Sequence, residues 1–217
     1  MEETYRILNR VGIALCLVGV IDIIVFIYCA RNDINYSSSF NIFAVVAGLF
    51  LIKGSIRVAR IITLFSAFLL AAFVGLLITF PLMQPVELQL IDFKLNPVSR
   101  QLSIVFMLLA TGFIYWVYRQ LSSEPVMLAR KKAGLSYGFP KQAVALGIIL
   151  VAGLSFAMNN LSNSDSASQA KIKANEIYGD TYAYHVTHIN NSDGYVLARL
   201  TAYNESEIRS VEVKWRE

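Results

Sequence analysis

Five long apolar stretches, separated by short polar segments, dominate the first 160 positions of this 217-residue chain. Spanning the hydrocarbon core of a bilayer takes about 20 residues of helix, with a range of about 17–25. The pattern therefore predicts a membrane bundle of about five transmembrane helices over residues 1–160. We expect the spans at about residues 11–30, 38–53, 60–80, 101–118 and 142–158.

The second stretch, Phe40–Ile52, is the shortest of the five. It reaches spanning length only if Ser38, Ser39 and the stem of Lys53 lie in the membrane, with the ammonium group snorkelling to the surface. A re-entrant segment is the competing interpretation. The choice between them decides on which side of the membrane every later loop lies.

The basic residues favour five spans. With five, ten Lys and Arg fall on one side and three on the other, and cytoplasmic loops carry the excess of basic residues. The N-terminus is then inside the cell and the C-terminus outside. The ten are Arg6, Arg10, Lys53, Arg57, Arg60, Arg119, Arg130, Lys131, Lys132 and Lys141, and the three are Arg31, Lys94 and Arg100.

Two loops are longer than simple connections. Residues 83–100 alternate apolar and polar positions between Pro85 and Pro97, which predicts a short amphipathic segment on the outer membrane surface or on the C-terminal domain. In the loop 119–141, we predict that Arg130, Lys131 and Lys132 face lipid and attract anionic head groups at about 1 kcal/mol per residue. The alternative is that these three residues only signal topology.

Residues 161–217 change character and predict a small α+β domain outside the membrane. A short helix is expected over 168–178, with Ala170, Ala174 and Ile177 on one face and Gly179 as its stop. Period-two alternation predicts strands over 182–189, 195–203 and 208–215, and Asp193-Gly194 is a hairpin turn signal. About 50 residues without a disulfide or metal are near the lower limit for independent stability, so this domain is expected to pack on something else.

Composition agrees with a membrane location. Mean hydropathy is +0.53 and only 16% of residues are charged, against roughly 25% in soluble proteins. The net charge of +4 divides into +6 for residues 1–160 and −2 for residues 161–217, so the positive excess belongs to the membrane part. Topology explains this excess better than nucleic-acid binding does.

Asp22 is the one carboxylate inside the five stretches. A carboxylate at that depth costs about 3 kcal/mol and is usually paired or functional. Thr111 lies at a similar depth in the fourth span. Three roles stay open for Asp22: hydrogen bonding within the bundle, contact with another subunit, and handling of protons or cations. Small residues at spacing four, such as Ala44 and Gly48, favour a closely packed bundle.

No catalytic or phosphate-binding motif is present, and His185 and His188 are expected on opposite faces of a strand, which argues against a shared metal ion. We expect no cofactor. The sequence favours a non-enzymatic subunit, assembly factor or sensor of a homo- or hetero-oligomeric complex in a bacterial cytoplasmic membrane, whose outer domain binds a partner. A small channel or transporter using Asp22 is the alternative, and a lipid-directed enzyme is third.

The candidate interface residues are Trp215, Val211 and Val213, which share one face of the last predicted strand. Trp is enriched both in cores and at interfaces, so these residues are candidates for either. We expect the core role for Trp215.

Overall fold

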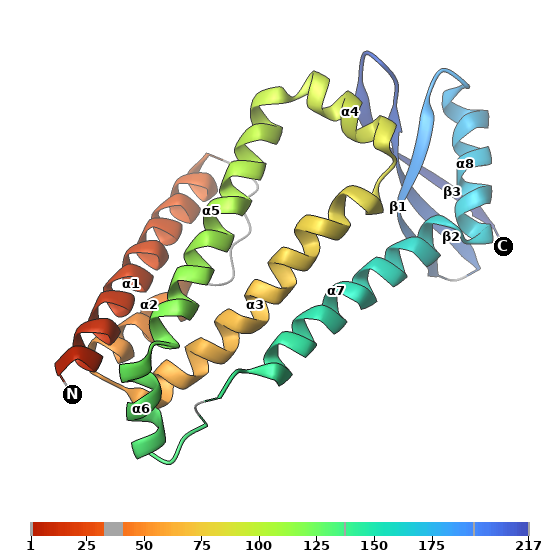
Figure 1. Ribbon diagram of the computed structural model, residues 1–217. Helices are drawn as coiled ribbons and strands as arrows, with labels where there is room; N and C mark the ends of the chain where they lie inside the picture. The colour runs from red at the N-terminus through yellow and green to blue at the C-terminus, as the bar shows by residue number, and fades with distance from the viewer. Residues whose placement is uncertain (1, 33–40, 137, 193, 217) are drawn as a thin grey trace. The chain divides into compact units, whose positions relative to one another are not determined.

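The computed structural model describes residues 2–32, 41–136, 138–192 and 194–216. The chain divides into two compact units, and Figure 1 shows the helices and strands that make them up. Unit 1 comprises Met1–Ala71 and Ala110–Leu146, and unit 2 comprises Ala72–Leu109 and Gly147–Glu217. Three long helices contribute one part to each unit: α3 (Ile56–Met83), α5 (Pro97–Leu121) and α7 (Lys141–Ser162).

Four of the described helices are long and apolar enough to cross a membrane: α3, α5, α7 and α1 (Glu2–Arg31). The second predicted span, residues 38–53, is not among them. Its residues 38–40 lie outside the described residues, and the rest forms α2 (Asn41–Ile52), a helix of 12 residues. Twelve residues rise about 18 Å against a hydrocarbon core of about 30 Å, so α2 by itself is too short to cross. Gly54, with φ of +79°, is the second residue after its end.

In unit 1, α2 packs closely against α1 in the opposite direction. A Cβ added to Gly12 of α1 would lie 2.6 Å from the carbonyl oxygen of Gly48 in α2, so only glycine permits this approach. One turn further along α1, the thiol of Cys16 donates to the carbonyl oxygen of Val45 at 3.6 Å. The chain therefore returns along α1 toward the end at which it began.

An apolar cluster at that end of unit 1 joins five helices. It combines the first turns of α1 and α3 with the last turns of α2 and α5 and with α6 (Glu124–Lys132). Thr4 also donates to the carbonyl oxygen of Pro125 at 3.2 Å, and the Arg10 guanidinium lies 5.9 Å from the ring centre of Trp116. The buried members of the cluster are Leu8, Val11, Leu51, Ala59, Val117, Leu121 and Val126.

In unit 2, the predicted amphipathic segment is the helix α4 (Val86–Leu95). Side chains fix both of its ends. Gln89 donates to the carbonyl oxygens of Pro81 and Gln84, at 2.6 and 3.0 Å, and Arg100 at the start of α5 forms an ion pair with Asp92. These contacts hold α4 between α3 and α5.

The C-terminal part of unit 2 contains the predicted helix and three-stranded antiparallel meander. α8 (Asp165–Tyr178) precedes β1 (Ala183–Ser192), β2 (Tyr195–Tyr203) and β3 (Ile208–Arg216), in the sheet order β1-β2-β3. Ser192 pairs with Tyr195 across a two-residue connection in which Gly194 has φ of +73°. Asp193, the other residue of this predicted turn, lies outside the described residues.

α8 begins three residues earlier than predicted because the Ser164 hydroxyl accepts the Ala167 N–H at 3.1 Å and caps the helix. Its buried face is Ala167, Ala170 and Ala174, which lets the helix lie close to one face of the sheet. Ile177 is 60% exposed, contrary to the prediction. Tyr178, four residues after Ala174, takes that place and donates to the carbonyl oxygen of Glu212 at 3.0 Å.

Candidate functional site

The two polar residues that were predicted to lie within the membrane belong to the same unit. Asp22 in α1 and Thr111 in α5 are both half-buried in unit 1. Each takes part in an interaction. Partial burial of both side chains is compatible with each of the roles that the sequence leaves open for Asp22.

The three basic residues of α6 do not behave alike. Lys131 and Lys132 are exposed. Arg130 is only 3% exposed, so the prediction that it faces lipid was wrong for this residue. Its guanidinium turns inward, where it donates to the hydroxyl of Thr63 in α3 and to the carbonyl oxygen of Leu121 at the end of α5.

The candidate interface residues of β3 lie in the core of the C-terminal domain. Val211 and Val213 are 6% and 2% exposed and contact the alanine face of α8. Trp215 is half-buried and packs against the same cluster. These side chains hold the domain together and leave little surface for a partner.

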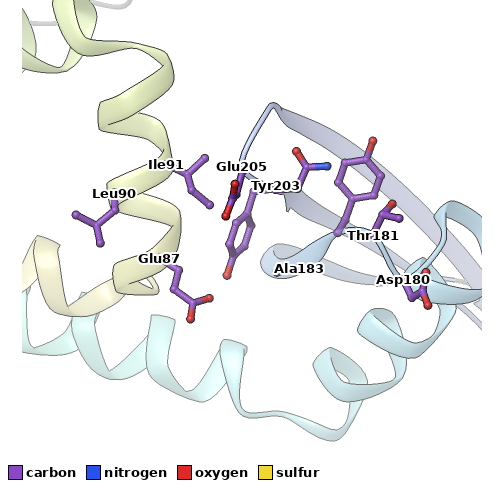
Figure 2. Close-up of a pocket in the computed structure, with 10 residues that line it drawn as sticks. Glu87, Leu90, Ile91, Asp180, Thr181, Ala183, Tyr203 and Glu205 are labelled. Carbon is purple, nitrogen blue, oxygen red and sulfur yellow. The ribbon is translucent and has the colours of Figure 1, made fainter.

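An open groove of about 570 Å³ in unit 2 is the candidate functional site (Figure 2). One wall is α4, with Glu87, Leu90 and Ile91. The other wall comes from two connections of the C-terminal domain, the one before β1 and the turn after β2. These supply Asp180, Thr181, Tyr182, Ala183, Tyr203, Asn204 and Glu205.

The groove is acidic. Glu87, Asp180 and Glu205 line it, and none of its described lining residues is a lysine or arginine. Burial, followed by the charge of Glu87, raises the pKa of Tyr203, so this phenol stays protonated at neutral pH. Its side chain and that of Glu87 lie side by side in Figure 2. The surface offers carboxylates and phenols, with Leu90 66% exposed beside them.

A neighbouring tyrosine is fixed by its own contacts. The Tyr182 hydroxyl donates to the carboxylate of Glu207, which raises the pKa of Tyr182. The guanidinium of Arg209 lies 4.3 Å from the centre of the Tyr182 ring. These contacts position the β1 end of the groove.

Sequence reasoning did not identify this groove. It placed residues 83–100 on the membrane surface or on the C-terminal domain, and α4 does line the groove with that domain. The groove-lining carboxylates come from three segments far apart in the chain. The one available signal was that Asp180 and Glu205 stand in the connections that flank predicted strands.

A second cavity of about 480 Å³ in unit 2 contains His185 and Lys171 among its lining residues. Burial, and then the charge of Lys171, lowers the pKa of His185 below its usual value, so the imidazole is neutral at pH 7. His185 is buried and His188 is exposed. A register shift between Val186 and His188 interrupts the regular alternation from which opposite faces were predicted, and the two histidines pair with Thr201 and Arg199, which share one face of β2. Among the described residues, no three His, Cys, Asp or Glu side chains gather in a way that could hold a metal ion.

Comparison of the chain with family models, with curated proteins and with solved structures finds no match. The class of the protein therefore rests on its own architecture. It is a mostly helical chain with four helices long and apolar enough to cross a membrane, followed by a C-terminal three-stranded antiparallel sheet.

Proposed function

We propose that this protein is a non-enzymatic subunit, assembly factor or sensor of a membrane complex, and that its C-terminal domain binds a partner through the acidic groove. The proposed location is a bacterial cytoplasmic membrane, with the N-terminus inside and residues 161–217 outside. The observation that carries the proposal is the groove itself. It combines three carboxylates, no cation on its described lining and an exposed apolar helix face.

These properties indicate the chemistry of the partner. A cationic segment with an apolar side chain would complement the carboxylates and Leu90 together. Electrostatic complementarity of this kind speeds association and excludes partners of the wrong charge. A short segment fits a groove of about 570 Å³ better than a folded domain does.

The test compares three variants of the full chain in affinity purification from membranes in mild detergent. Glu87→Lys combined with Glu205→Lys reverses charge on both walls of the groove. We expect at least about a tenfold loss of the partner, since like charges placed opposite one another cost several kcal/mol. Deletion of Ser166–Glu217 is expected to lose the partner altogether while the helices still insert.

Glu176→Lys is the matched control. This carboxylate belongs to the same domain but lies on the exposed side of α8, in an ion pair with Lys173. Exposed pairs of this type contribute about 0–1 kcal/mol, so the control should keep both fold and partner. A partner that is retained in full by the double variant and by the deletion would refute the proposal.

Substitution of Asp22 separates the proposal from the channel or transporter alternative. Asp22→Asn keeps the shape and the hydrogen-bonding capacity but removes the titratable charge. A partner-binding subunit is expected to accumulate and function nearly as the wild type, whereas Asp22→Leu should lower its abundance. Loss of function in Asp22→Asn at normal abundance in the membrane would favour the alternative.

A further inference from the structure

Arg130 is a buried cation, and its hydrogen bonds within the described residues go to neutral groups. One guanidinium nitrogen, Nη2, donates to both the Thr63 hydroxyl and the Leu121 carbonyl oxygen. Thr63 is itself buried and donates to the carbonyl oxygen of Ala59 at 2.7 Å. The Nε atom of Arg130 is buried and has no hydrogen-bond partner among the described residues.

Arg60 supplies a second guanidinium, whose charge acts on Arg130. It precedes Thr63 by three positions in α3, so the two share a helix face. The Nε atom of Arg60 is also buried without a partner in the described part of the chain. Burial, and then the charge of Arg60, lowers the pKa of Arg130, as two neighbouring cations require.

The described residues do not supply the missing negative charge. The ion pairs found among them, Arg100–Asp92, Lys173–Glu176 and Arg199–Glu212, all lie in unit 2. The carboxyl end of α5 faces Arg130 through Leu121, and a helix end supplies about half an elementary charge. Two guanidinium groups therefore remain largely uncompensated, that of Arg130 buried and that of Arg60 half-buried. A buried charge without a counter-ion is strongly destabilising.

The position of the two arginines indicates the depth of the missing anion. Arg60 lies directly before the apolar stretch Ile61–Phe80, and Leu121, which accepts from Arg130, follows the apolar stretch Leu102–Val117. In a membrane, the boundary between an apolar stretch and a charged segment lies at the level of the lipid phosphates. Arginine binds phosphate by parallel N–H donors, which two unsatisfied guanidinium groups can provide.

We propose that Arg60 and Arg130 form a binding site for a phosphate group, positioned by Thr63 and by the carboxyl end of α5. The phosphate comes from the head group of an anionic phospholipid or from free inorganic phosphate. The site differs from a general attraction of basic residues to the membrane, because it depends on these two side chains. It rests on the proposed membrane location and not on binding of a partner by the acidic groove.

The test uses the full chain in nonionic detergent at fixed ionic strength. Three additives are compared by the shift in melting temperature and by native mass spectrometry: phosphatidylglycerol, diacylglycerol with the same acyl chains, and inorganic phosphate. We expect phosphatidylglycerol to bind one per chain and to raise the melting temperature, whereas diacylglycerol, which lacks the phosphate, does neither. The same shift with inorganic phosphate alone identifies free phosphate as the source.

Four variants locate the site. Arg60→Gln and Arg130→Gln each remove a charge-assisted hydrogen bond to the phosphate, and binding should weaken roughly tenfold or more. The matched controls are Arg57→Gln in α3 and Lys132→Gln in α6, which remove an exposed charge from the same helices and should bind as the wild type.

The Arg60 side chain makes no hydrogen bond within the described residues, so Arg60→Gln is expected to leave the fold intact. This variant therefore decides the test if Arg130→Gln does not fold. Equal weakening in all four variants would mean general charge attraction and would overturn the proposal. Absence of any effect of phosphatidylglycerol and phosphate would also overturn it. If an acidic protein co-purifies with the wild type but not with Arg60→Gln, the ligand of the site is a carboxylate and the phosphate proposal is overturned.

Discussion

A phosphatase reporter that is active only outside the cytoplasm is expected to be silent when fused after Lys132 and active when fused after Glu217. Ten basic residues against three predict this orientation. The fold of unit 1 shows which helix ends lie together. The N-terminal end of α1, the start of α3, the end of α5 and α6 share one apolar cluster, so they lie on the same side of any membrane that the helices cross.

A fusion after Asn96, between α4 and α5, is the internal control and should be active. The opposite pattern at Lys132 and Asn96 would reverse the orientation and place the C-terminal domain inside. If the reporter is active after Lys132 and silent after Glu217, the C-terminal domain lies in the cytoplasm and cannot bind a partner outside the membrane. The reporter after Arg31 separately tests whether the chain crosses the membrane once before α2.

The apolar stretches predicted the long helices well, because a helix in lipid must satisfy its own backbone and its length is set by the bilayer. The length of the apolar stretch was least reliable as a predictor at α2. Its 12 residues complete a return along α1 that depends on contact between Gly12 and Gly48 rather than on a full apolar span. A pairing of two glycines 36 positions apart is a tertiary feature and carries no local signal.

The C-terminal strands were predicted from alternation within a few residues of their observed bounds, since one face is buried by α8 and the other is not. The segment 83–100 was harder. Alternation of polar and apolar residues did not reveal a helix, and α4 is held by contacts of Gln89 and Asp92 with the flanking helices.

The sites were the least predictable part. Arg130 and its acceptor Thr63 are 67 positions apart, and nothing near Arg130 in the sequence distinguishes it from Lys131 and Lys132. A basic residue at a helix end is ordinarily exposed, so burial had to come from the fold. The groove also depends on the fold, because α4 supplies one wall and two connections distant in the sequence supply the other.

Leu200→Ala is expected to unfold the C-terminal domain in most molecules while the membrane part stays intact. Leu200 is fully buried in β2, between α8 and the neighbouring strands. Truncation of a buried leucine costs about 2–5 kcal/mol, because apolar contacts are lost and a cavity remains. A core as small as this one rarely supplies more than about 3–5 kcal/mol, so one substitution can remove most of the stability.

Leu197→Ala is the matched control, because it makes the same change in the same strand. Leu197 is 37% exposed and faces away from α8, so its truncation should cost well under half as much. Limited proteolysis of the full chain, with hydrogen exchange at β2 amides, measures both. Trp215→Ala should resemble Leu200→Ala if this half-buried ring belongs to the core, since it packs on the same cluster. If the Leu200 and Leu197 variants resist the protease equally, α8 and the sheet do not form the stabilising core of the domain. If Trp215→Ala stays protease-resistant but loses the partner, Trp215 is an interface anchor.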